Sequence, residues 1–94
     1  MIEDDNMSVK LITYDLNQPG QKHQKVVEKI KDYGKWARLS ESSYAVDTAS
    51  TPSAIFEDFK PLLDQNDHFL VVAMSKPFAG RQSNEVLDWL RNRL

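Results

Sequence analysis

Asp15 is the side chain whose position in this sequence best suits chemistry. It ends an alternating, β-branched stretch and is followed at once by the turn signal Asn17-Gln18-Pro19-Gly20. A hard cation such as Mg²⁺ takes one or two carboxylates together with water and phosphate oxygens. One carboxylate makes an incomplete site, whereas two copies of Asp15 meeting across a two-fold axis would form a metal site able to clamp a phosphodiester.

A structural role for Asp15 is the alternative. Short acidic side chains at the start of a turn often accept hydrogen bonds from backbone amides a little further along the chain. Asp15 would then bond the amides of residues 17 or 18. The sequence leaves the catalytic, the metal-binding and the structural interpretation open.

Lysines recur in the segment after this turn. Lys22, Lys25 and Lys29 line up beside the apolar arc of a predicted helix, Gln21–Tyr33, and Arg38 adds a cation just before a serine-containing hairpin. A row of this kind can follow a nucleic-acid backbone. Acidic residues interrupt the row, so the alternative is a solvated helix face with local ion pairs.

A second basic group surrounds the C-terminal segment, in which a helix over Ser83–Leu94 is predicted. Its arginines near the chain end suit the negative end of that helix dipole. Phe78 and Trp89 lie in the same region and belong to no clear apolar stripe, so an interface is the preferred explanation for both. Stacking on nucleic-acid bases is the alternative. The basic residues are Lys76, Arg81, Arg91 and Arg93.

Several classes of site are missing from the sequence. There is no cysteine, which excludes a disulfide scaffold, a thiolate zinc site and a cysteine nucleophile. His23 and His68 stand alone, with no second histidine at a metal-binding spacing. There is no phosphate-binding loop, no glycine-rich dinucleotide fingerprint and no nucleophile elbow. We therefore expect no organic cofactor.

Charge and hydropathy favour a cytoplasmic protein that does not enter membranes. The longest purely apolar run, Phe69–Met74, is far too short to span a bilayer, and the N-terminus lacks the features of a signal peptide. Residues 1–7 are predicted to be a short acidic extension. From Met7 onward, twelve Lys and Arg face eleven Asp and Glu, so the remaining chain has a net charge of +1. This mild basicity is compatible with a nucleic-acid ligand.

The predicted elements indicate a single α+β domain over residues 8–94. Their order is strand, helix, strand, strand, helix, strand and a terminal helix, which is the ferredoxin-like βαββαβ sandwich with an additional C-terminal helix. Both faces of the last strand are apolar, so we expect the terminal helix or a second copy to cover the second sheet face. The strands are Ser8–Leu16, Lys35–Leu39, Ser43–Thr48 and His68–Ser75, and the helices are Gln21–Tyr33, Pro52–Leu63 with Thr51 as cap and a distortion at Pro61, and Ser83–Leu94.

Several of these segments resemble one known group of proteins. The first strand and turn contain Tyr14-Asp15-Leu16-Asn17-Gln18-Pro19-Gly20, and the hairpin carries Trp36-Ala37-Arg38-Leu39 followed by a serine-rich strand. With these motifs, nearly the whole chain from Ser8 onward resembles the SinR-like small proteins. Those proteins are in turn similar to the Cas-two subunit of CRISPR systems and to the VapD toxin-related ribonucleases.

The resemblance implies a homodimer of ferredoxin-like subunits. It also implies that Asp15 lies near the dimer axis and takes part in binding a divalent metal, Mg²⁺ or Mn²⁺. Cas-two subunits usually end in an extra strand that crosses the dimer, whereas Ser83–Leu94 has helical periodicity. We therefore expect a dimeric module that binds nucleic acid or a protein partner. The alternative is a metal-dependent ribonuclease or deoxyribonuclease that uses Asp15 from both subunits. The resemblance to VapD is also compatible with a component of a toxin–antitoxin system.

Overall fold

An alternating, β-branched segment and a continuous apolar run form two strands that pair with each other. In the computed structural model, which describes residues 7–94, β1 spans Ser8–Asp15 and β4 spans His68–Ala73. The predicted extension over residues 1–7 lies, apart from Met7, outside the described residues. The other elements are α1 (Gly20–Lys31), β2 (Trp36–Ser40), β3 (Ser43–Thr48), α2 (Pro52–Phe59), the 3₁₀ turn η2 (Lys60–Leu62) and α3 (Asn84–Arg93).

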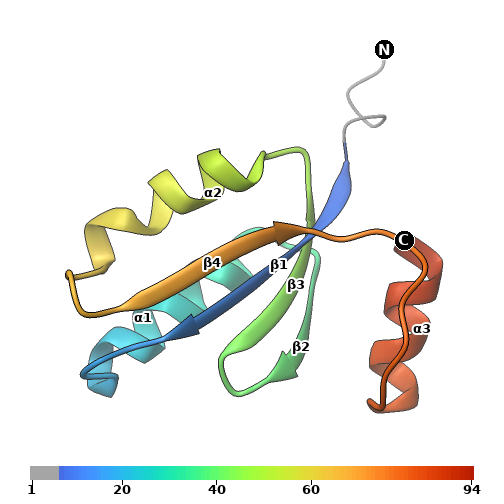
Figure 1. The fold of residues 1–94 in the computed structure, drawn as a ribbon, viewed down its shortest axis with the longest axis horizontal. Helices are drawn as coiled ribbons and strands as arrows, with labels where there is room; N and C mark the ends of the chain where they lie inside the picture. The colour runs from blue at the N-terminus through green and yellow to red at the C-terminus, as the bar shows by residue number, and fades with distance from the viewer. Residues whose placement is uncertain (1–6) are drawn as a thin grey trace.

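The four strands form one antiparallel sheet in the order β2-β3-β1-β4 (Figure 1). Ile12 in β1 stands opposite Tyr44 in β3 and Val71 in β4, so these three apolar residues lie on the same face of the sheet. This topology confirms the predicted βαββαβ arrangement. Most observed ends differ from the predicted ones by one or two residues, which is the usual uncertainty of element boundaries. The exception is the second helix, whose α-helical part ends at Phe59 and continues as the 3₁₀ turn η2.

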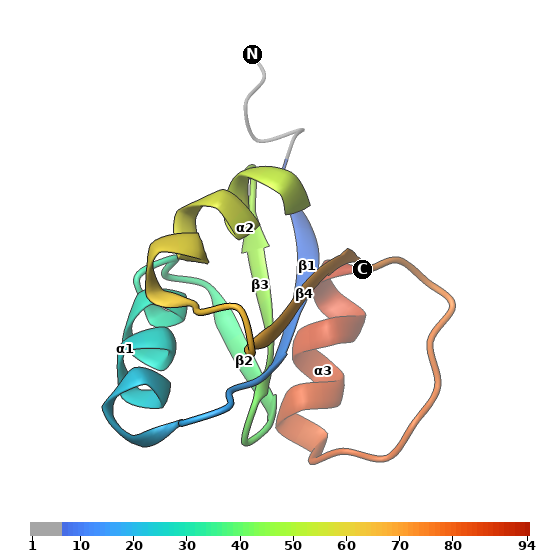
Figure 2. The same cartoon turned by 60° about the vertical axis from the view of Figure 1, so that its left-hand side comes forward.

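Two helices cover one face of this sheet. Figure 2 shows α1 and α2 on the same side of the strands. The main core forms between these helices and the sheet, and Phe59 is its largest fully buried side chain. Its buried members are Ile12, Tyr14, Leu16, Val26, Ile30, Tyr44, Val46, Ile55 and Phe59.

The ends of α2 have local causes that the sequence predicts correctly. The Thr51 hydroxyl accepts a hydrogen bond from the Ala54 amide at 3.1 Å, and Pro52 occupies the first turn, where its missing N–H costs nothing. Pro61 cannot donate to the preceding turn of an α-helix, and there the chain tightens into η2. No helix within residues 7–94 has the length and apolar character needed to cross a bilayer.

The terminal helix α3 packs on the other face of the sheet. Figure 2 shows it across the sheet from α1 and α2, at the end of a long loop. Leu90 of α3 is buried against Val9 and Ala45, and the Gln82 side chain before the helix donates to the Leu39 carbonyl at 2.8 Å. This second core therefore lies over the β2–β3 side of the sheet and the beginning of β1.

The β4 side of that face stays open. Leu70 is 59% exposed and Val72 is 41% exposed, and Leu11, their neighbour on β1, is only half-buried. Within one chain, the terminal helix therefore does not cover the whole second face of the last strand, and a second copy as its cover stays a prediction. Within the described residues, α3 is too far toward β2 to shield the outer half of the second face.

Replacing Phe59 tests which helix contacts hold the fold together. Phe59→Ala should lower the free energy of unfolding by about 3–5 kcal/mol, because it leaves a cavity in the main core. Phe56→Ala, in the same helix but 37% exposed, serves as the matched control and should cost about 1–2 kcal/mol. Urea unfolding followed by circular dichroism measures both values, and equal losses would contradict the assignment of the core.

Candidate functional site

Asp15 lies at the exposed end of β1, beside the edge strand. It stands directly opposite His68, the first residue of β4, in the antiparallel register. By alternation both residues belong to the open face, the one that carries Leu70. The backbone interpretation of Asp15 is wrong for residue 17, because the Asn17 amide donates instead to the Asp67 carboxylate at 2.8 Å.

One chain supplies too few ligands here for a divalent metal. Mg²⁺ needs near-octahedral coordination by oxygen, and this end of the sheet offers one carboxylate together with an imidazole. No group of three or more histidine, aspartate or glutamate side chains suited to a metal gathers anywhere in residues 7–94. The donor set of a single copy therefore does not fit the predicted Mg²⁺ or Mn²⁺, and a metal site at Asp15 depends on a second copy.

A small hollow opens behind Asp15, where the end of β1, the start of α1 and the β2–β3 turn meet. It has a volume of about 290 Å³, and Tyr14, His23 and Glu41 are among its lining residues. The Tyr14 hydroxyl lies 3.5 Å from both His23 Nδ1 and the Glu41 carbonyl, at the limit of a hydrogen bond. The Tyr14 ring also stacks on Phe69 at 6.1 Å between centroids.

Burial keeps the Tyr14 phenol protonated. Desolvation, with smaller contributions from Tyr44 and Glu41, raises the pKa of Tyr14 to about 12 although the Arg38 charge acts in the opposite direction. A phenol with such a pKa is neutral at physiological pH, so it can donate a hydrogen bond but cannot act as a base. Tyr14 therefore acts chiefly as a core residue whose hydroxyl reaches the hollow.

Lys22 joins two turns that lie far apart in the sequence. Its ammonium group lies 2.8 Å from Asp64 and 2.7 Å from Asp67, and the Asp67 side chain has no exposed surface. The Asp67 carboxylate also accepts hydrogen bonds from the amides of Asn17 and Asp64, at 2.8 and 2.9 Å. The turn after β1 and the turn before β4 are thus held together, which fixes Asp15 and the start of α1 in position.

These contacts stabilise the charged form of Asp67. Hydrogen bonding to Lys22 first, and then to the Asp64 and Asn17 amides, lowers the pKa of Asp67 to about 2 despite the opposing effect of desolvation. The Lys22 bond, followed by the Asn66 amide, also lowers the pKa of Asp64. Asp67 is therefore a structural carboxylate that stays ionised at all ordinary pH values.

The predicted basic row on α1 is mostly occupied by such ion pairs. Besides Lys22, Lys29 lies 3.3 Å from Asp58 of α2, which also accepts from the Tyr33 hydroxyl at 3.1 Å. Of the three lysines of the row, only Lys25, which is exposed, has no carboxylate partner in the described residues. The row therefore links α1 to α2 and to the turn before β4.

Arg38 and the C-terminal basic group lie on other surfaces. Arg38 is exposed on β2 and donates from Nε to the Ser40 carbonyl at 3.3 Å. Arg93 pairs with Asp47 at 3.4 Å and covers the Trp89 ring at 4.4 Å. Phe78 and Trp89 both pack against the second core. The structure therefore does not bring Asp15, the α1 lysines and Arg38 into one cluster.

Asp67 is a key residue of this region that the sequence does not single out. The sequence signal is the spacing of Asp64 and Asp67 in the turn before the last strand. In the structure the Asp64 carboxylate accepts a hydrogen bond from the Asn66 amide, and the Asp67 carboxylate accepts one from the Asp64 amide. What the sequence cannot provide is the identity of the cation, because Lys22 lies more than forty residues away along the chain.

The chain was compared with protein-family models, with curated proteins and with solved structures, and none of them matched. The conclusions on function therefore depend on the geometry of the chain itself.

The low pKa of Asp67 predicts how stability changes with pH. Between about pH 4 and pH 2 the native state keeps the Asp67 carboxylate charged, whereas in the unfolded chain the same group, with a pKa near 3.8, binds a proton. The stabilisation is therefore complete above about pH 5 and is lost as the pH falls toward the native pKa of about 2. Asp67→Asn should lower the urea midpoint at neutral pH and flatten its decline in acid. Asp32→Asn, which changes an exposed aspartate, is the control and should keep the wild-type profile. If the urea midpoints of wild type and Asp67→Asn fell in parallel as the pH is lowered, the stabilising role of the Asp67 contacts would be contradicted.

Proposed function

We propose that this chain works as a homodimeric, Cas-two-like module that binds nucleic acid. The dimer forms over the open face of the sheet, between β1 and β4. The observation that carries this proposal is the exposure of Leu70 and Val72 on the face of β4, an edge strand that also lacks charged residues.

The two edges of the sheet differ in this respect. The outer strand β2 carries the charged Arg38, has a register shift next to it, and has the Leu39 carbonyl occupied by Gln82. Charges and irregularities of this kind keep edge strands apart. The sequence of β4, HFLVVA, contains no Lys, Arg, Asp, Glu or Pro, and its pairing with β1 is regular. This difference favours association on the β4 side of the sheet, where Leu70 and Val72 are exposed, over association on the β2 side.

The exposed side chains favour face packing over edge pairing. Joining two β4 strands edge to edge would extend the sheet but leave Leu70 and Val72 in water. It would also place three strand spacings, about 14 Å, between the two β1 strands, so that two Asp15 side chains would not share an ion. Packing face to face buries the apolar residues directly and brings the polar ends of the two faces, with Asp15 and His68, into the same interface.

Unpaired cations support a nucleic-acid ligand. Within the described residues, Lys25, Arg38, Lys76 and Arg81 have no carboxylate within ion-pair distance. Cations that are not used for internal pairing are available to phosphates, and each such contact adds affinity through counterion release. The resemblance to the SinR-like and Cas-two proteins is consistent with this ligand.

The metal-dependent phosphodiesterase is the second candidate function. It is favoured by one observation, the juxtaposition of Asp15 with His68 at the polar end of the open face. Two copies of Asp15 would be needed for a cation there, since one copy offers a single carboxylate. We rank it below the binding module for that reason.

A charge placed on the open face tests the dimer. Leu70→Glu should convert the protein to a monomer, with a dissociation constant raised on the order of 100-fold, because like charges would face each other across the interface. Ala73→Glu is the matched control: it lies on the same strand but on the opposite face, opposite Lys10, and should leave the dimer intact. Sedimentation equilibrium measures both. A wild-type protein that stays monomeric, or a control that dissociates equally, would refute this interface.

Incubation with single-stranded RNA and DNA in the presence of Mg²⁺ or Mn²⁺ separates the two candidate functions. We expect binding that weakens as salt rises, without cleavage. Denaturing gels report cleavage and fluorescence anisotropy reports binding. Metal-dependent cleavage that is lost in Asp15→Ala and kept in Asp32→Ala, another exposed aspartate, would establish the phosphodiesterase instead.

A further inference from the structure

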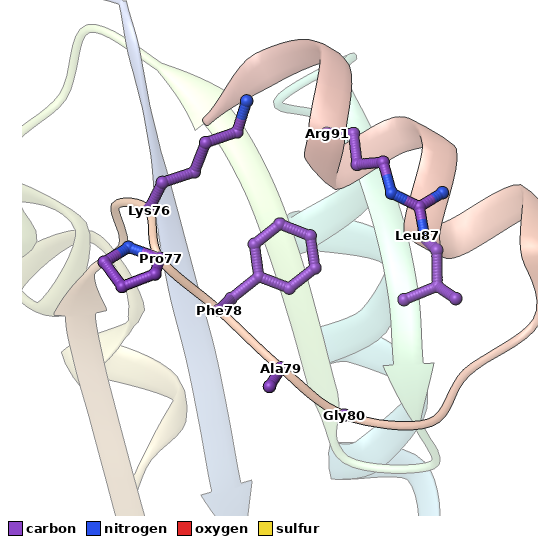
Figure 3. Close-up of a pocket in the computed structure, with 7 residues that line it drawn as sticks. All are labelled: Lys76, Pro77, Phe78, Ala79, Gly80, Leu87 and Arg91. Atoms are coloured by element: carbon purple, nitrogen blue, oxygen red, sulfur yellow. The ribbon is translucent and has the colours of Figure 1, made fainter.

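A hollow lies between the loop after β4 and helix α3. It measures about 640 Å³, and Lys76, Phe78, Leu87 and Arg91 contribute side chains to it. This volume is within the range of small-molecule sites in proteins. Figure 3 shows the Phe78 ring between the Lys76 side chain, which comes from the loop, and Arg91 and Leu87, which come from α3.

The chemistry of this hollow is that of a site for an anion with a flat, apolar part. Lys76 has no carboxylate partner in the described residues, and Arg91 pairs only with Asp88, at 3.0 Å in an exposed i,i+3 contact. Such surface pairs are weak and give way to a better ligand. Phe78 and Leu87 are both half-buried and supply the apolar wall between the two cations.

The backbone of the loop adds further donors. The amides of residues 78–81 donate no hydrogen bond within the described part of the chain. Lys76, Ala79 and Gly80 are exposed. Backbone amides without an internal acceptor can donate to phosphate oxygens, as backbone donors commonly do at protein–nucleic acid contacts.

We propose that this hollow is the place where the protein binds single-stranded nucleic acid, with one base on the Phe78 ring and the flanking phosphates on Lys76 and Arg91. The inference rests on the proposed nucleic-acid-binding function and gives it a location, which is not the lysine row of α1. A single strand fits better than a duplex, because a base must be unstacked from its neighbours to lie on an aromatic ring. An acidic peptide would match the two cations but would leave the ring and Leu87 without a partner.

Binding of a labelled oligothymidine or oligouridine, followed by fluorescence anisotropy over a range of salt concentrations, tests the location. Lys76→Gln and Arg91→Gln should each weaken binding by about three- to tenfold and lower the slope of log K against log salt by about 0.7, the value for one phosphate contact on a single strand. Phe78→Leu keeps an apolar side chain against the second core but removes the aromatic ring, and it should weaken binding about fivefold without changing the salt slope. Lys60→Gln, which removes an exposed charge from η2 on the other side of the sheet, should bind like the wild type.

The possible results distinguish this inference from the proposed function. If Lys25→Gln and Arg38→Gln weaken binding while Lys76→Gln and Arg91→Gln do not, the protein binds nucleic acid but the location is wrong. If the wild type does not bind either oligonucleotide at low salt, the proposed function fails and takes the inference with it. If polyglutamate displaces the labelled strand as well as an unlabelled strand of equal charge does, the hollow is an acidic-peptide site. Urea unfolding of Phe78→Leu verifies that this variant is folded.

Discussion

The structure depends on one constraint: a single layer of helices covers only one face of a four-stranded sheet. Side chains alternate along a strand, so each residue that β1 gives to the main core, such as Ile12, is flanked by residues that belong to the other face, such as Leu11. The chain carries apolar residues on both faces and therefore has more to bury than α1 and α2 can cover. The short helix α3 solves part of this problem, since it buries Val9 and Ala45 but leaves Leu70 and Val72 in water.

Charges in this protein serve mainly to hold the helix layer in place. Lys22 and Lys29 reach from α1 to Asp67 and Asp58, and the shielded Asp67 ties the turn after β1 to the turn before β4. Single exposed ion pairs contribute little, but Asp67 combines a cation with two backbone amides and has no exposed surface. The lysines that look most suited to a nucleic-acid backbone in the sequence are therefore largely used for packing.

The sequence predicts the fold well because its signals are local. The Thr51-Pro52 start of α2, the distortion at Pro61 and the alternation in β4 each depend on neighbouring residues only. The site is predicted less well because its geometry depends on contacts between distant segments. No local pattern could show that Asp67 rather than Asp15 accepts the Asn17 amide, or that Lys76 and Arg91 line the same hollow. The apolar residues on both faces of β4 indicate that its second face needs a cover, but they do not show how much of that cover α3 provides.

The open face and the hollow are connected by a single run of chain. β4 exposes Leu70 and Val72, and within a few residues the same segment provides Lys76 and Phe78. One hollow with two cations can neutralise only about two phosphates, which makes weak binding at physiological salt. A dimer over the open face would present two such hollows in a fixed, symmetric arrangement, and a strand held at one of them would reach the other at a high effective concentration. Burial of the second sheet face and affinity for a single strand would then have the same physical origin, the association of two copies through β4.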